Sequence, residues 1–152
     1  MISKDELEVG QVLWLKLRYQ IDVVSNVKHP MLICKIEDNY IEVIAMDKNA
    51  GKMHLLYHNY NYYINSDTPK ESVIFEDSYA QLNTKLTIDK IDELKYSRKT
   101  LKKLSTDKLN NLLREYENYQ NKYNIEEQRI VHMTNNEILY LNPDLDQKLV
   151  VE

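Results

Sequence analysis

Up to residue 88, hydrophobic residues occur in short runs and alternations, a pattern typical of β-strands rather than of amphipathic helices. Residues 31–36 and 40–46 form two apolar runs just after Pro30, and the polar residues 37–39 separate them. Each run is too short for a typical helix, and the Glu-Asp-Asn sequence between them is typical of a turn. The pattern therefore predicts a β-hairpin at the centre of a sheet.

Further strands are predicted on both sides of this hairpin. Residues 9–17 and 81–88 alternate between apolar and polar side chains, so each should present one face to a core. The inner-face residues are Leu13, Leu15 and Leu17 in the first stretch, and Leu82, Thr84, Leu86 and Ile88 in the second. Residues 53–63 and 72–75 are predicted as additional strands, whereas the mixed stretch 18–27 is predicted as a loop that lines a site.

The pattern changes to a helical spacing after residue 104. Ser105 is a suitable N-cap, Asp107 suits the first turn, and apolar residues then recur every three or four positions. They are Leu109, Leu112, Leu113, Tyr116, Tyr119 and Tyr123. We expect the stripe of Leu109, Leu113 and Tyr116 to pack on the sheet or on a second subunit. Residues 129–134 and 137–141 are predicted to form a terminal hairpin across Asn135-Asn136.

Length and composition favour one soluble α+β domain, mostly β, over the 152 residues. It divides into a β-rich part at about 7–90, a helical part at about 91–123 and an extension at 124–152. Cys34 is the single cysteine and lies in an apolar run, so a small buried side chain and a cytoplasmic location are expected. No apolar run approaches the roughly 18 residues that span a bilayer, so no membrane partner is expected. The net charge of -4 disfavours broad nucleic-acid affinity but allows a local basic patch.

Three short motifs occur in a meaningful order: Gly10-Gln11-Val12-Leu13-Trp14, Pro30-Met31-Leu32-Ile33 and Leu86-Thr87-Ile88-Asp89-Lys90. With these motifs, the chain from Val9 to about Tyr123 resembles the MazF/PemK family of toxin endoribonucleases. The resemblance implies a small SH3-like barrel with helices, a homodimer, and cleavage of single-stranded RNA without a metal or other cofactor. It also implies neutralisation by an antitoxin peptide.

The same resemblance points to positions for the chemistry. Family members usually carry Arg directly before the proline, where this chain has His29 preceded by Lys28. Where they have Thr at the end of the second hairpin strand, this chain has Met46-Asp47-Lys48. Some members place Arg and Asp before the Thr-Ile-Asp run, and the matching residues here are Gln81 and Asn83.

The chemistry of these side chains suggests roles for three of them. His29 can exchange protons near neutral pH, Asp47 can accept the proton of a ribose 2'-hydroxyl, and Lys28 can stabilise a phosphate, although without the fork of Arg. The alternative readings are a surface histidine before a proline and an aspartate in a turn. Catalytic roles for His29, Asp47 and Lys28 are therefore the first hypothesis.

Other residues are candidates for RNA binding. Tyr57, Tyr60 and Tyr62 can stack on unpaired bases, or else pack over the barrel. Residues 94–104 contain no acidic residue and form either a basic patch or a solvated face. The cationic candidates are Lys85, Lys95, Arg98 and Lys99.

A metal site is not expected from the histidine spacing. His54 and His58 lie four residues apart, but they have no cysteine pair or carboxylate partner, so this is the weakest form of a ligand signal. Two function classes remain open. The first is a toxin-type endoribonuclease, and the second is a non-catalytic barrel that binds RNA or a protein partner.

Overall fold

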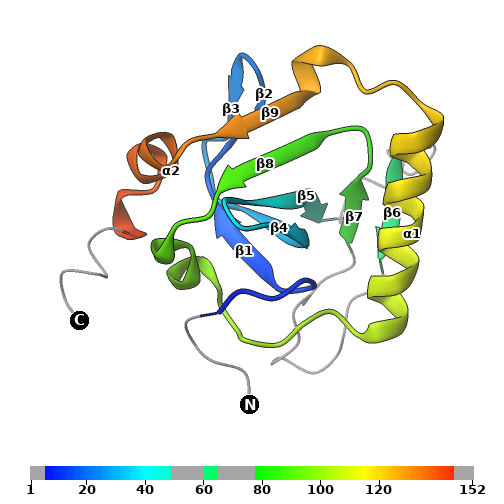
Figure 1. The fold of residues 1–152 in the computed structure, drawn as a ribbon, viewed down its shortest axis with the longest axis horizontal. Coiled ribbons are helices and arrows are strands. Elements are labelled where there is room, and N and C mark those ends of the chain that lie inside the picture. Colours follow the sequence, from blue (N-terminus) through cyan, green and yellow to red (C-terminus); the bar gives the residue numbers. More distant parts are fainter. Residues whose placement is uncertain (1–5, 49–59, 65–77, 146–152) are drawn as a thin grey trace.

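The computed structural model describes residues 6–48, 60–64 and 78–145. Over these residues the chain has a mixed α/β fold, with a mostly antiparallel sheet of seven strands and few helices (Figure 1). The predicted strand at 72–75 and most of the one at 53–63 lie outside the described residues, as do Tyr57, His54 and His58.

The central hairpin of the sheet is confirmed. Its strands are β4 (His29–Ile36) and β5 (Tyr40–Lys48), and β1 (Val12–Leu15) pairs with the outer edge of β4. All of these pairs are antiparallel, and Met31 lies opposite Ala45. The hairpin therefore fixes which residues of β4 and β5 meet at each end.

Strand β5 changes its neighbour along its length. Its first residues pair with β8 (Lys85–Asp89), and its last residues pair with β7 (Ser78–Gln81), which in turn pairs with β6 (Asn61–Ile64). The single strand predicted at 81–88 is thus two strands joined by a turn. Leu82, Thr84, Leu86 and Ile88 are all buried, as predicted, but they do not share one face, because Leu82 packs in one hydrophobic cluster and Leu86 and Ile88 pack in another.

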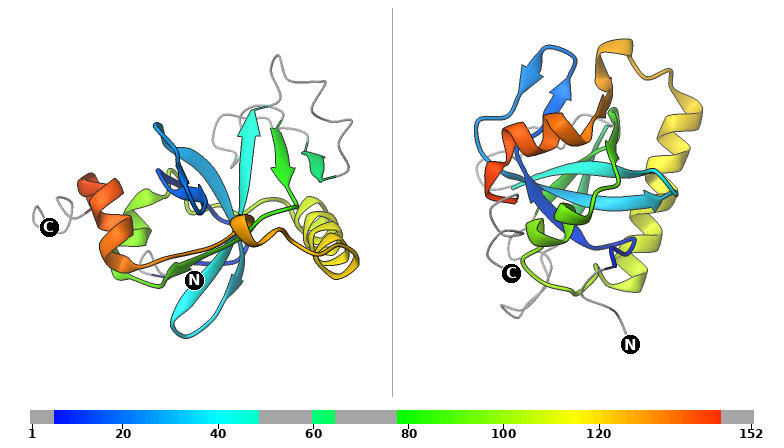
Figure 2. Two further views of the ribbon diagram at one scale, coloured as in Figure 1. Left: turned by 90° about the horizontal axis from the view of Figure 1, so that it is seen from above. Right: turned by 60° about the vertical axis from the view of Figure 1, so that its left-hand side comes forward.

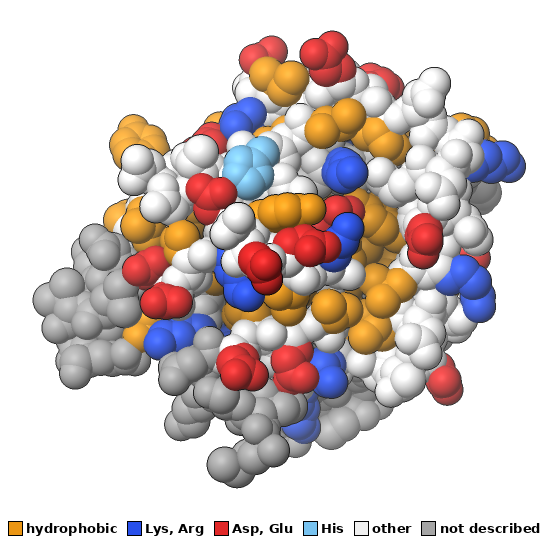
Figure 3. All heavy atoms as spheres, in the orientation of Figure 1, with side chains coloured by type: hydrophobic (Ala, Val, Ile, Leu, Met, Phe, Trp, Pro, Cys, Tyr) orange, Lys and Arg blue, Asp and Glu red, His pale blue; other side chains and the backbone are white. Residues whose placement is uncertain are grey.

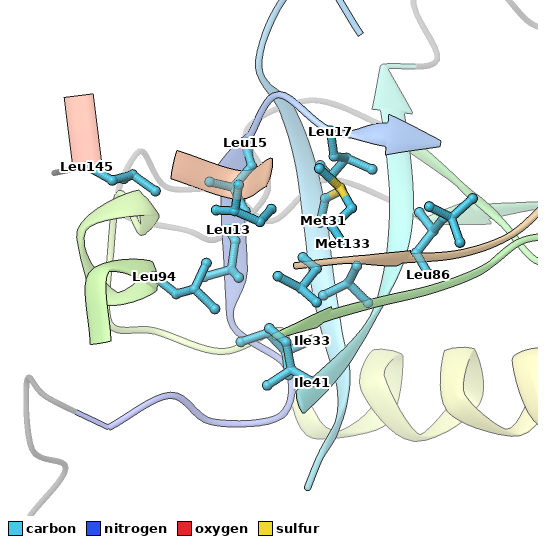
Figure 4. Close-up of a cluster of buried hydrophobic side chains, with 14 residues drawn as sticks. Leu13, Leu15, Leu17, Met31, Ile33, Ile41, Leu86, Leu94, Met133 and Leu145 are labelled. Carbon is cyan, nitrogen blue, oxygen red and sulfur yellow. The ribbon is translucent and has the colours of Figure 1, made fainter. Parts of the chain in front are cut away.

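Hydrophobic clusters lie on both faces of β1, β4 and β5. One cluster contains Leu13, Leu15, Leu17, Met31, Ile33, Ile41, Leu86, Leu94, Met133 and Leu145, and Figure 4 shows these side chains converging from strands, a 3-10 helix and the C-terminal segment. The other contains Val12, Leu32 and Ile44, whose side chains point the opposite way. Burial on both faces explains why residues 31–33 read as a continuous apolar run.

Helix α1 (Thr106–Lys122) covers the second cluster. It begins directly after Ser105, as predicted, although the Ser105 side chain makes no cap hydrogen bond. Leu112 and Tyr116 are buried and Leu109 packs against the cluster, whereas Leu113 is only half-buried and lies outside it. The predicted stripe is therefore correct at Leu109 and Tyr116 and wrong at Leu113. The neighbouring Leu112 is buried in the cluster instead.

Polar contacts also attach α1 to the sheet. The Tyr116 hydroxyl donates a hydrogen bond of 2.6 Å to the buried carboxylate of Glu42. The Gln120 amide donates to the carbonyl oxygens of Leu82 and Thr84, in the turn between β7 and β8. Burial raises the pKa of Tyr116, as do the nearby Cys34 and Glu42, so the hydroxyl stays protonated as a donor.

Gly10 allows α1 to approach the start of β1. Its φ of +98° is unfavourable for residues with a side chain, and a Cβ there would lie 2.9 Å from Leu109 Cδ2. The carbonyl of Gly10 accepts a hydrogen bond from the Leu104 amide, just before the helix. The positive φ and the close approach of Leu109 are the structural reasons for a glycine at this position.

The prediction of a loop at 18–27 is corrected by a small two-stranded sheet. Strands β2 (Arg18–Gln20) and β3 (Val23–Val24) pair antiparallel with an irregular register. The Leu17 amide donates to the Ser25 hydroxyl, and the Ser25 amide donates to the Leu17 carbonyl. These bonds close the turn, although the strands are too short for a visible alternation in the sequence.

The predicted terminal hairpin is wrong. Strand β9 (Ile130–Met133) pairs parallel with β8, and the residues after it form helix α2 (Asn135–Leu141). Thr134 caps that helix by accepting a hydrogen bond from the Glu137 amide. Asn135-Asn136 therefore begins a helix instead of closing a hairpin.

The segment after α2 returns to the first strand. Asn142 is fully buried and its side chain bonds both the amide and the carbonyl of Lys16, while Leu145 enters the first cluster. The remaining elements are the 3-10 helices η2 (Asp92–Ser97) and η3 (Glu127–Arg129). Figure 2 shows α1 and α2 on different sides of the sheet.

The pairing of strands does not close into a barrel within the described ranges. Among the described residues, one isolated antiparallel bridge joins Leu13 of β1 to Arg98. None of the helices in the described residues is long and apolar enough to cross a membrane.

Candidate functional site

A pocket of about 380 Å³ lies at the end of the central hairpin where β4 begins and β5 ends. Strands β4, β5 and β7 and the segment between β1 and β4 supply its walls. The described residues that line it are Leu17, Tyr19, Val24, Ser25, Asn26, Val27, His29, Met31, Ala45, Met46, Asp47 and Gln81. The pocket therefore joins two of the three predicted catalytic residues, His29 and Asp47, with Gln81.

The register of the hairpin brings His29 and Asp47 together. Met31 pairs with Ala45, His29 lies two residues before Met31, and Asp47 lies two residues after Ala45. Because side chains alternate along a strand, all four point to the same face, and the two polar ones lie at the same end. Both are half-buried, so they are held in place and still reach solvent.

Tyr79 contacts Asp47 from the neighbouring strand. The two residues pair directly across β5 and β7, and the Tyr79 hydroxyl lies 3.4 Å from Asp47 Oδ2, to which it donates. Burial raises the pKa of Tyr79 to about 12, and the nearby Asp47 carboxylate adds to the effect. Tyr79 therefore remains a neutral donor, which orients the carboxylate.

This shift predicts a loss of stability at alkaline pH. Below pH 10.0, the ordinary pKa of tyrosine, Tyr79 is protonated in both folded and unfolded chains. From there to about pH 12 the unfolded chain releases the proton and the folded chain keeps it, so the free energy of unfolding falls as pH rises. We expect Tyr79→Phe to reduce that fall, measured by urea unfolding at pH 9 and pH 11. If the free energy of unfolding falls equally in the variant, the pKa of Tyr79 is not raised. Tyr116 is also buried, but it is present in both proteins and contributes equally to both.

The small β2–β3 sheet, in the stretch predicted as a loop, forms one side of the pocket. Val24 and Val27 line the pocket and are also exposed, as is Ile21 beside them. Two contacts attach this sheet to residues far along the chain. Arg18 forms an ion pair with Glu137 of α2, and the Ile21 amide donates a hydrogen bond to the Gln128 carbonyl. The pocket wall is therefore attached to the C-terminal part of the chain.

Lys28 does not line the pocket. Its ammonium group is ion-paired with Asp144, in the segment that follows α2. The two side chains are 39% and 41% exposed, and surface pairs of this kind contribute only about 0–1 kcal/mol. Lys28 therefore precedes the pocket residue His29 in the sequence, but its charge is neutralised by Asp144, which is distant in the chain.

The predicted basic patch is largely engaged with the protein itself. The Arg98 guanidinium donates to the Glu6 carbonyl, the Gln11 side chain and the Lys95 carbonyl. The Lys99 ammonium lies 3.6 Å from the centre of the Trp14 ring, and Lys95 lies beside Tyr96. These contacts hold residues 95–99 against β1, and none of Lys95, Arg98 and Lys99 lines the pocket.

The tyrosine candidates occupy different surroundings. Tyr62, on β6, packs against the second hydrophobic cluster, in line with the packing alternative. Tyr60 is half-buried just before β6, and its carbonyl accepts a hydrogen bond from Leu82. Lys85 is exposed at the start of β8, away from the pocket. Figure 3 shows basic and acidic side chains interspersed on this face of the molecule.

A polar cluster outside the predicted site residues joins β8, β9 and α2. His132 contacts the Thr87 hydroxyl at 2.7 Å and the Asp89 carboxylate at 2.8 Å, and Asp89 also accepts from the Asn135 amide. It attaches the parallel strand and the start of α2 to the sheet. The only sign of this cluster in the sequence is the Thr-x-x-Glu pattern at 134–137, which is typical of the start of a helix.

The sequence matches no known family model, and no curated protein matches it significantly. The case for a function therefore rests on the pocket and on the motifs.

Proposed function

We propose that this protein is a MazF/PemK-like endoribonuclease that cleaves single-stranded RNA in the pocket at the end of the central hairpin. The observation that carries the proposal is that His29 and Asp47 line the same pocket, from adjacent strands and from one face. An imidazole and a carboxylate that line one solvent-accessible hollow are suited to general acid and base catalysis.

The proposed reaction needs no group beyond the RNA and these side chains. Asp47 takes the proton of a ribose 2'-hydroxyl as that oxygen attacks the adjacent phosphorus. Protonated His29 donates its proton to the departing 5'-oxygen as the phosphorus–oxygen bond breaks. The products are a 2',3'-cyclic phosphate and a 5'-hydroxyl, and the proton gained by Asp47 returns to His29 through solvent. Tyr79 supports the step by orienting the Asp47 carboxylate.

Lys28 supplies the positive charge in this proposal. A phosphate in the pocket carries a full negative charge next to His29, and the exposed pair with Asp144 is weak enough for the phosphate to compete. Lys28 thereby steadies the charge that develops on the phosphate oxygens during attack.

The barrel and the partners implied by the family are part of the same proposal. The order β1, β4, β5, β8 and the bridge from Leu13 to Arg98 support an SH3-like arrangement, since the chain after β8 returns through η2 to the free edge of β1. A homodimer, an antitoxin-like protein and a cytoplasmic location follow from the resemblance.

RNA cleavage is the direct test. Purified protein is incubated with a mixed single-stranded RNA in EDTA, and the same sequence with 2'-deoxyribose serves as the control. We expect RNA fragments with cyclic phosphate and 5'-hydroxyl ends and an intact deoxy strand. RNA that stays intact, together with normal growth on induced expression, would overturn the nuclease proposal.

A non-catalytic barrel that binds RNA or a protein partner is the second candidate. The charge of the site counts against catalysis, because none of the described residues lining the pocket is Lys or Arg and Lys28 is paired with Asp144, so these residues offer no free cation to the transition state. Binding of RNA without cleavage in the experiment above would select this function.

A further inference from the structure

A second hollow, of about 590 Å³, lies at the C-terminal end of α1. Leu82 forms its wall on the sheet side, and residues on two successive turns of the helix form the other. These helix residues are Glu115, Asn118, Tyr119, Asn121, Lys122 and Tyr123. None of them belongs to the predicted RNA-binding set.

The hollow combines aromatic rings with polar and cationic groups. The rings of Tyr119 and Tyr123 lie 4.6 Å apart at an interplanar angle of 36°, and Tyr123 is 38% exposed. The Lys122 ammonium lies 5.4 Å from the centre of the Tyr123 ring, and Asn118 and Asn121 add amide donors and acceptors. Glu115 is the one acidic residue of the described lining and lies two helical turns before Lys122, so the phosphate would lie at the Lys122 end. The aromatic rings, the amides and this cation fit a flat, polar-edged ring that carries a phosphate, which describes an unpaired nucleotide.

This hollow lies next to the first pocket across the end of β7. Gln81 lines the first pocket and the adjacent Leu82 lines the second, and successive strand residues point to opposite faces. Tyr60 lies beside this end of β7, because its carbonyl accepts a hydrogen bond from the Leu82 amide. The two hollows therefore border the same end of β7 from opposite faces of the sheet, and a strand that occupies both passes around the turn between β7 and β8.

We propose that the hollow at the end of α1 is a second RNA subsite, in which Tyr119 and Tyr123 stack an unpaired base of the strand held in the first pocket. The inference rests on the proposed function for the class of substrate, single-stranded RNA. It adds the surface that the RNA contacts after it leaves the first pocket. Lys122 pairs with a phosphate of that nucleotide, and Tyr60 contacts the strand between the two sites. Binding of single-stranded RNA then extends beyond the nucleotides at the scissile bond.

Binding of a strand that cannot be cleaved tests this subsite separately from catalysis. The probes are a fluorescent 2'-O-methyl decauridine and the matching dinucleotide, and binding is followed by anisotropy for the decamer and by calorimetry for the dinucleotide. Tyr123→Ala is expected to weaken decamer binding about 5- to 150-fold, the loss typical of one stacked base, and to leave dinucleotide binding unchanged. Tyr123→Phe keeps the ring and should bind like the wild type.

Tyr140→Ala is the matched control, since Tyr140 is 84% exposed on α2, away from both hollows. Decamer binding that is absent in the wild type, unchanged in Tyr123→Ala, or reduced equally in Tyr140→Ala would overturn the subsite. Loss of binding in Tyr123→Ala alone supports it, whether or not the wild type cleaves the corresponding RNA. A failure of cleavage therefore counts against the proposed reaction and not against this site.

Discussion

His29→Ala and Asp47→Asn are each expected to slow RNA cleavage by about 10²- to 10⁴-fold, the usual loss when a general acid or base is removed. The two residues line one pocket, and each can exchange a proton with the substrate there. The rate is measured under single-turnover conditions on a short RNA, so that product release does not hide the chemical step.

A matched control variant makes this result specific. Asp38→Asn alters an exposed carboxylate at the other end of the same hairpin, and it should cleave at the wild-type rate. Circular dichroism and the melting temperature establish that each variant is folded. Near wild-type cleavage by both His29→Ala and Asp47→Asn would show that this pair does not carry the reaction, and Gln81 would be the next residue to test.

Leu112→Ala is expected to lower the free energy of unfolding by about 2–5 kcal/mol. Leu112 is fully buried between α1 and the sheet, so its truncation leaves a cavity beside Val12, Leu32 and Ile44. Urea unfolding at neutral pH measures the loss.

Leu113→Ala provides the comparison within the same turn of the helix. Both substitutions put alanine into α1 and so change helix propensity equally, but Leu113 is only half-buried and lies outside the cluster. The loss at Leu113 should be clearly smaller than at Leu112. Equal losses would mean that α1 is rotated relative to the position described here.

The elements that the sequence predicts well are those with a long, regular pattern. The central hairpin and α1 each carry enough apolar residues at one period to be recognised, and Pro30 and Ser105 mark where they begin. Strands β2 and β3 have only three and two residues, so no period exists to detect. At 135–136, the Asn-Asn pair suits a hairpin turn and a helix start equally, and the Thr134 cap decided the outcome.

The sequence predicted only the part of the candidate site that depends on residue pairing within the central hairpin. His29 and Asp47 could be placed at one end of the hairpin because an antiparallel pair fixes both positions at once. The contact between Tyr79 and Asp47 depends on β5 changing its neighbour, and the pair of Lys28 with Asp144 joins residues 116 positions apart. Neither contact is marked by a periodic pattern in the sequence, because each depends on the tertiary fold.

The C-terminal segment packs against the first strand, and this has a consequence for synthesis on the ribosome. Leu13 and Leu15 share their cluster with Ile138 and Leu145, and Asn142 bonds the backbone of Lys16. Protein chains emerge N-terminus first, at about 5–20 residues per second, so the nascent β1 waits several seconds for these neighbours. During that interval its leucines are open to chaperones and to contacts with other nascent chains, and the first cluster can be completed only after residue 145 has left the exit tunnel.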